Sequence, residues 1–246
     1  ASIVAYYLEL MGYSDRANPW FRWDNEDDYR QYGSKAIGFS LGFWVDPRAF
    51  PETAQQARKK LVHDVFPMPG CNGVSQKFKD LVEEFEPGVH QFIPIKLRNK
   101  AGEPYEGNYY VFNCMVAFDA LLVNEMDRDW EYHNATDGPN LALFRTSIRD
   151  RIVVSSPRIA GKHLWTPLYL GPEYKGVFCS DAFHKELVAR KIRYLDAKHC
   201  EELDIPWLPE ENIQPALDWE AKHGIPCGYR AKLRAEVLKK RGKLEL

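Results

Sequence analysis

Residues 70–97 read GCNGVSQKFKDLVEEFEPGVHQFIPIKL, and this stretch decides the fold. Phe78, Leu81 and Phe85 recur at the spacing of one face of a helix. Ser75 stands just before them, where a hydroxyl can accept hydrogen bonds from the free N–H groups of the first helical turn. The stretch therefore predicts the end of a strand, a helix capped by Ser75, a turn and a second strand.

The turn after this helix is marked by Pro87 and Gly88, which stop a helix. An apolar segment of strand length follows at residues 92–97. Beyond a turn at residues 100–104, residues 108–122 form a long apolar run rich in Tyr, Val and Phe. We therefore expect the segment that follows Gly88 to pair with this run as a hairpin.

Residues 176–195 repeat the theme of the opening stretch. Ser180 is followed by Phe183 and then by a Leu-Val pair, much as Ser75 is followed by Phe78 and its own Leu-Val pair. This similarity fits an internal duplication, and it also fits two unrelated helices with the same capping chemistry. Both interpretations stay open from the sequence.

The rest of the chain divides into segments of different character. Residues 13–33 have no clean period and are expected to be a long loop or an insertion. Together the segments predict an α+β fold, with mixed and mainly antiparallel sheets packed against helices in one domain over residues 1–246. The remaining predictions are strands at 2–11 and 36–45, a short helix at 52–62, β-rich regions at 141–159 and 164–170, and helices at 210–246.

The composition excludes several classes of protein. Lys and Arg number 33 against 35 Asp and Glu, for a net charge of −2, so nothing global indicates a nucleic-acid or anionic-membrane partner. No apolar run approaches the roughly 18 residues that a membrane span needs, and the first residues lack the basic region of a signal peptide. The five cysteines are widely spaced, which is typical of reduced, buried thiols. We therefore expect a cytoplasmic protein.

The sequence contains no recognised catalytic or metal-binding motif. GxSxG, GxGxxG, the P-loop, CxxC and HxxxH are all missing. The candidate bases are His163 and His184, and the candidate nucleophiles are Ser155, Ser156, Cys179 and Ser180, of which Ser180 is better explained as a helix cap. His199 and Cys200 are adjacent, so their side chains point in different directions. We expect no catalytic residue, no cofactor and no metal.

An aromatic and acidic stretch near the N-terminus is the strongest candidate for a functional surface. Exposed tryptophans surrounded by carboxylates are typical of specific protein-binding sites. Trp20 and Trp23 could instead cover the core beneath their own loop, and both interpretations stay open. Trp130, in a second acidic stretch, is expected to belong to the core. The candidate binding residues are Trp20, Trp23, Asp24, Glu26, Asp27 and Asp28.

Several short motifs resemble the bacterial immunity-protein family typified by myxobacterial members. They are VSQKFKDL at 74–81, EPGVHQFIPI at 86–95, YYVFN at 109–113, DAL at 119–121 and VFCSD at 177–181. The resemblance covers roughly residues 64–197 and marks a fold more than a site.

The resemblance implies a function that depends on binding and not on catalysis. Such a protein neutralises a cognate toxin by binding it stoichiometrically, and the toxin is encoded beside it. Many toxins of this class act on nucleic acids through basic clefts, for which an acidic aromatic surface would be complementary. Two other functions remain open. An enzyme with an unrecognised site would need a pocket with convergent polar groups, and a structural subunit would need a large apolar face.

Overall fold

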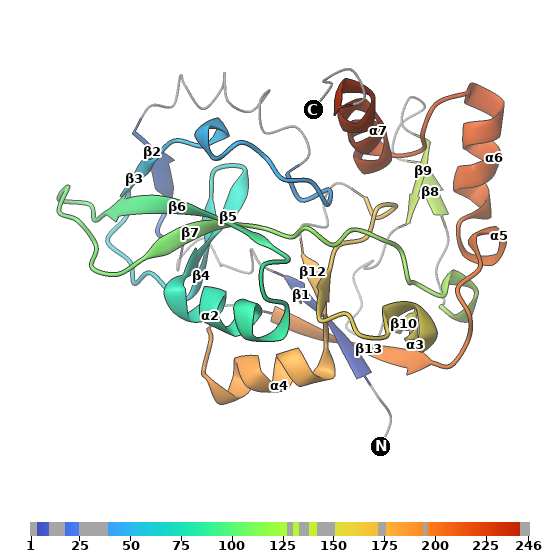
Figure 1. Cartoon of the computed structure of the whole chain (residues 1–246), viewed down its shortest axis with the longest axis horizontal. Coiled ribbons are helices and arrows are strands. Elements are labelled where there is room, and N and C mark those ends of the chain that lie inside the picture. The colour runs from blue at the N-terminus through green and yellow to red at the C-terminus, as the bar shows by residue number, and fades with distance from the viewer. Residues whose placement is uncertain are drawn as a thin grey trace.

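The computed structural model describes residues 4–9, 18–24, 39–126, 130–132, 138–141, 151–171, 176–193 and 196–241. These residues form two sheets, a short hairpin and helices packed against them, which confirms the α+β class (Figure 1). Most of the predicted 13–33 insertion lies outside the described residues, and so does the start of the predicted 36–45 strand.

The larger sheet has the strand order β2-β3-β6-β7-β5-β4. Neighbouring strands are antiparallel except β3 and β6, which are parallel. Its strands are β2 (Phe21–Trp23), β3 (Thr53–Gln56), β4 (Val65–Met68), β5 (Cys71–Ser75), β6 (Gln91–Arg98) and β7 (Tyr109–Asn113). The predicted hairpin is confirmed, because β6 pairs with β7 from Gln91 opposite Asn113 to Ile95 opposite Tyr109.

The smaller sheet has the strand order β10-β13-β1-β12-β11. Here too one neighbouring pair is parallel, β10 with β13, and the others are antiparallel. Its strands are β1 (Val4–Glu9), β10 (Ile152–Ser155), β11 (Leu164–Trp165), β12 (Val177–Ser180) and β13 (Asp196–Leu203). A separate hairpin joins β8 (Trp130–Tyr132) to β9 (Pro139–Leu141).

The helices are mostly short, and the two that follow β5 and β12 organise the fold. They are α2 (Gln76–Phe85) and α4 (Asp181–Ala189). The other α-helices are α3 (Ser156–Ile159), α5 (Pro209–Asn212), α6 (Gln214–His223) and α7 (Tyr229–Arg241), and the 3-10 helices are η1 (Pro47–Ala49) and η2 (Val123–Glu125). Of the helices described, none is long and apolar enough to cross a bilayer.

The two sheets have equivalent topology, which supports the internal duplication. The order β3-β6-β7-β5-β4 in one sheet corresponds to β10-β13-β1-β12-β11 in the other, with the parallel pair at the same place. The helix follows the equivalent strand in both, β5 before α2 and β12 before α4. The position of β7 is taken by β1, so the N-terminal strand completes a unit whose other strands lie near the C-terminus.

The cap of each helix has the same local geometry. The Ser75 hydroxyl accepts from the Phe78 N–H at 3.3 Å, and the Ser180 hydroxyl accepts from the Phe183 N–H at 3.2 Å. Each serine N–H donates to the residue just before the neighbouring edge strand, which is Asp64 before β4 and His163 before β11. The side chains of those two residues also bond the serine hydroxyls at 2.8 Å.

Helices α2 and α4 pack against each other and join the two units (Figure 1). Phe78 and Phe183 are both fully buried, with ring centroids 6.4 Å apart, and Phe85 meets Phe183 at 5.3 Å. At the surface, Arg190 donates to the carboxylate of Glu84 at 2.9 Å. One apolar cluster therefore spans both units.

Two secondary-structure predictions were wrong. Residues 52–62 contain β3 and no helix, because the edge of β6 offers parallel backbone pairing to Thr53 and Gln55. Residues 39–45 form turns and irregular chain, because Ser40 and Gly42 take positive φ values of 57° and 83°. In both places tertiary contacts override the local preference.

The predicted C-terminal helices are confirmed, and they dock onto the units through side chains that bond to backbone. Arg230 donates to the carbonyl of Ser40 at 2.8 Å, and Arg234 donates to that of Leu41 at 2.6 Å. Asn212 accepts from the Val123 N–H at 2.9 Å. Trp130 packs against two apolar clusters, as expected, and the five cysteines are buried thiols that form no disulfide with a described residue.

Candidate functional site

Trp20 is held at the outer edge of the larger sheet with 45% of its surface exposed. Its φ of +50° is uncommon for a residue other than glycine, and local hydrogen bonds hold it there. The Trp20 N–H donates to the Asn18 side chain at 2.8 Å, and its carbonyl accepts from the Ala57 N–H at 2.9 Å. The guanidinium of Arg58 lies 4.9 Å from the ring centroid. The indole is therefore both exposed and fixed in position.

Trp23 is a core residue. It is 2% exposed and packs in an apolar cluster that includes Phe21, Phe66 and Ile95. Its indole N–H donates to the carbonyl of Pro69 at 3.4 Å. Of the two interpretations of this tryptophan, packing under its own segment is the one that the structure shows.

Asp24 follows β2 and is already engaged. Arg98 forms an ion pair with its carboxylate at 2.6 Å, and the Thr53 hydroxyl donates to it. Burial raises the pKa of Asp24, but the hydrogen bonds from Thr53 and Arg98 outweigh burial and lower the pKa. Glu26, Asp27 and Asp28 lie outside the described residues.

An open pocket of about 460 Å³ lies beside β2 and β3. It contains two of the sequence candidates, Trp23 and Asp24, and its other lining residues are Arg22, Gln55, Gln56, Ala57 and Lys100. Gln56 is anchored by a hydrogen bond from the hydroxyl of Tyr105 at 2.8 Å. The pocket wall is therefore polar and well supported.

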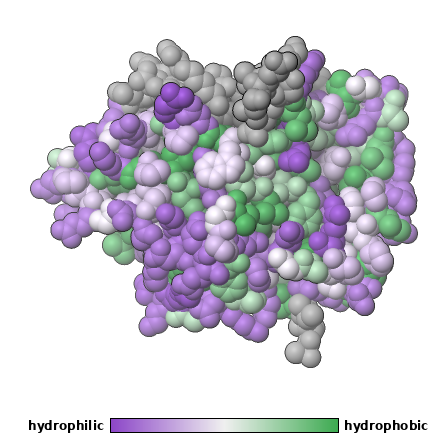
Figure 2. Space-filling model, viewed as in Figure 1, coloured by the Kyte–Doolittle hydropathy of each residue, from purple (hydrophilic) through white to green (hydrophobic). Residues whose placement is uncertain are grey.

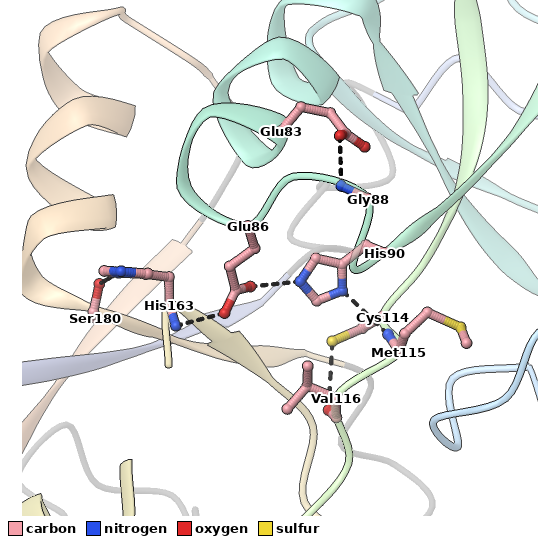
Figure 3. Close-up of polar contacts among 9 residues, drawn as sticks. All are labelled: Glu83, Glu86, Gly88, His90, Cys114, Met115, Val116, His163 and Ser180. Carbon is pink, nitrogen blue, oxygen red and sulfur yellow. Dashed lines mark hydrogen bonds and ion pairs between the residues drawn. The ribbon is translucent and has the colours of Figure 1, made fainter. Parts of the chain in front are cut away.

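A second polar cluster lies in the interior, where α2 ends against the smaller sheet (Figure 3). The Glu86 carboxylate, 8% exposed, meets Nε2 of His90 at 2.6 Å and accepts from the backbone N–H of His163 at 2.9 Å. Burial raises the pKa of Glu86, but the bonds from His90 and His163 outweigh burial and lower the pKa. Through these two contacts Glu86 links His90, just before β6, to His163, just before β11.

His90 completes this cluster, between the Glu86 carboxylate and the backbone of Met115. Its Nδ1 accepts from the Met115 N–H at 3.1 Å, which places its proton on Nε2, facing Glu86 (Figure 3). Burial lowers the pKa of His90, and its neighbours Cys114 and Glu86 outweigh burial and raise the pKa. Protonation at Nδ1 would remove the hydrogen bond from Met115.

The interior cluster does not have the layout of a catalytic triad. Nδ1 of His163 meets the Ser180 hydroxyl at 2.8 Å, but that hydroxyl also caps α4. Glu86 bonds to the backbone of His163 and to a different imidazole, so it does not orient the ring beside Ser180. Across the described residues, no three His, Cys, Asp or Glu side chains gather to hold a metal ion.

A family model described as immunity protein family Imm11 matches residues 7–202. The chain belongs to this immunity protein family. The match extends further than the 64–197 resemblance, since it begins within β1, takes in β2 and ends within β13. Helices α5, α6 and α7 follow the matched region. The sequence matches no curated protein.

The immunity protein contains pocket residues that the sequence did not single out. Arg22, Gln55 and Lys100 line the pocket, yet none stood out by motif. A helix is predicted for the segment that contains Gln55, and that prediction does not place Gln55 on the same sheet face as Arg22. The alternation of polar Thr53 and Gln55 with buried Ala54 was the available signal.

Proposed function

We propose that this immunity protein binds one cognate toxin stoichiometrically and blocks it without chemistry of its own. The toxin would be the product of an adjacent gene, met in the cytoplasm. The observation that carries the proposal is the exposed indole of Trp20, a residue whose carbonyl bonds to Ala57 in the wall of an open polar pocket, on a member of an immunity protein family. Tryptophan is among the residues most enriched at binding hot spots.

The proposed surface consists of Trp20, Asp24, the pocket, and Glu26, Asp27 and Asp28, which follow directly in the chain. Trp23 supports this surface from beneath. We expect Trp23→Ala to destabilise the fold by about 3–5 kcal/mol, as a buried aromatic does when truncated. Trp20 is therefore the residue to test.

An enzyme with an unrecognised site has less support. The polar cluster with the strongest pairing of acid and base, Glu86 with His90, is buried and consists of groups that bond to one another and to backbone. The pocket beside β2 holds one carboxylate, which is already paired with Arg98. Neither arrangement leaves a general base facing a substrate.

The test is co-expression with the toxin of the neighbouring gene, inactivated for purification. We expect a one-to-one complex and restored growth. Trp20→Ala should weaken binding at least tenfold, about 1.4 kcal/mol, and leave thermal unfolding unchanged. Trp44→Ala is the matched control, since Trp44 is 57% exposed on a different segment. Failure of the wild-type protein to bind or protect would refute the proposal.

A further inference from the structure

Side chains that point outward from β2, β3 and β6 form one row across the larger sheet. Arg22 lies opposite Gln55, and Gln55 lies opposite Arg98 in the strand pairing. Residues opposite each other on paired strands share a face, and burial alternates accordingly, with Trp23, Ala54 and Leu97 on the core side. The row therefore places two guanidinium groups on either side of an amide.

The lining of the pocket has more positive than negative side chains, Arg22 and Lys100 against Asp24. Arg22, Lys96 and Lys100 are exposed, and within the described part of the chain none of the three forms an ion pair. The one carboxylate in the pocket, Asp24, is paired with Arg98 and accepts a hydrogen bond from the Thr53 hydroxyl. Cations without an ion pair to another described residue can bind an anion without first breaking such a pair.

The pocket lies where these cations converge. Arg22 and Lys100 both line it, and the Gln55 amide, which donates to the Lys100 carbonyl at 3.3 Å, connects the row to the turn that contains Lys100. In Figure 2 the end of the molecule where this β6–β7 turn projects is hydrophilic. A volume of about 460 Å³ is ample for a side chain with its neighbouring backbone.

We infer that the pocket between Arg22 and Lys100 receives an acidic segment of the toxin, whose Asp or Glu carboxylate is bound by these two cations while its backbone passes Trp20. The inference rests on the proposed function and names the chemistry of the partner. It also differs from the expectation that an acidic surface meets a basic cleft, because the described lining of the pocket has two cations, Arg22 and Lys100, and one carboxylate, Asp24.

A protein segment fits this site better than a nucleic acid. The chain as a whole has a net charge of −2, and phosphate-backbone binding relies on an extended positive field. Two of the cations here, Arg22 and Lys100, line one pocket with a polar wall. A single carboxylate on a folded partner matches that pair of cations.

The experiment measures binding of the inactivated toxin to charge-reversal variants of the full chain. Arg22→Glu and Lys100→Glu should each raise Kd at least tenfold, and the affinity of the variants should depend less on NaCl concentration than that of the wild type. Lys162→Glu is the matched control, because Lys162 is exposed on the smaller sheet's side and should change Kd less than twofold. Thermal unfolding of each variant verifies the fold.

The outcomes separate the inference from the function beneath it. If Trp20→Ala weakens binding while both charge reversals bind like the wild type, the inference falls and the proposed function stands. If the wild type does not bind the toxin, both fall.

A single-stranded DNA oligonucleotide serves as the competing probe. If Arg22→Glu abolishes DNA binding without affecting toxin binding, the pocket is a phosphate site and the inference is wrong. A toxin in which one acidic residue is changed to Lys should bind the Lys100→Glu variant with restored affinity. That toxin residue would then be the one that supplies the bound carboxylate.

Discussion

The two equivalent units of this immunity protein differ most at their edges. Beyond β3, the larger sheet continues into β2, with Trp20 and the cationic pocket beside it. Beside β10, the equivalent strand of the smaller sheet, residues 120–122 form a single antiparallel bridge, Leu121 opposite Val154, in place of a further strand. The shared part of the two units forms the core, and the proposed binding surface lies where the larger unit departs from the repeat. A duplicated scaffold can thus keep its packing while one copy acquires an edge that contacts a partner.

The largest expected effect tests whether the two units contribute equally to the stability of the apolar cluster that they share. Phe78→Ala and Phe183→Ala each remove a fully buried ring from the same apolar cluster. We expect each to lower the free energy of unfolding by about 3–5 kcal/mol, measured by urea denaturation. Val188→Ala is the control, since Val188 is 64% exposed on the same helix as Phe183 and should change stability by less than about 0.5 kcal/mol. Losses that differ severalfold between the two rings would mean that the units are not energetically equivalent.

Substitutions at the C-terminal ends of α2 and α4 should lower the free energy of unfolding by unequal amounts. Glu86 caps α2 in the interior and bonds to His90 and His163, whereas Arg190 caps α4 at the surface. We expect Glu86→Gln to lower stability by about 2 kcal/mol at pH 7, since an amide cannot accept from both donors as a carboxylate does. Arg190→Gln, the matched change at the equivalent helix end, should have a much smaller effect because its ion pairs are exposed.

The pH dependence of the Glu86→Gln effect follows from the lowered pKa of Glu86. A carboxyl group whose pKa is lower in the folded state stabilises the fold above its unfolded pKa, near 4.5, and loses that contribution as the pH falls through the folded pKa. The deficit of the variant should therefore be full at neutral pH and shrink below about pH 4.5. Urea titrations between pH 7 and pH 3 measure it, and a deficit that grows on acidification would contradict the assignment.

The smallest effect compares the two capping serines. Ser75→Ala and Ser180→Ala each remove one hydroxyl that accepts from the first turn of its helix. We expect a loss of about 1 kcal/mol in each case, by the same measurement. A Ser→Thr change at either position keeps the acceptor and serves as the control. Equal losses would support a common capping geometry, and a loss at one position alone would restrict it to that unit.

Much of the core fold could be predicted because its signals are local. A serine three residues before a buried phenylalanine specifies a capped helix by bonds within one turn, and both helices were predicted correctly. The apparent echo of the two Leu-Val pairs was less informative. Val82 is buried but Val188 is exposed, because the second pair is displaced by one residue along its helix.

The candidate site was predictable in part. The sequence indicates the aromatic stretch, but composition does not distinguish Trp20 from Trp23. These two residues of the same type have exposed fractions of 45% and 2%. Their difference comes from the alternation of β2 and from the turn at Trp20, which exist once β3 pairs with this segment. The pocket itself is built from β2, β3 and the β6–β7 turn, which are distant in sequence.

The sequence by itself determined the α+β class, the two capped helices, the hairpin of β6 with β7 and the resemblance to an immunity protein family, since each depends on short-range periodicity, capping or local motifs. The tertiary structure alone decided that β1 completes the second unit, that residues 53–56 are a strand, and that cations gather beside Trp20. These features depend on strand pairing between distant segments. Backbone hydrogen bonds of that kind favour a partner strand over local propensity, and in a strand as short as residues 53–56 they leave only a brief alternation in the sequence.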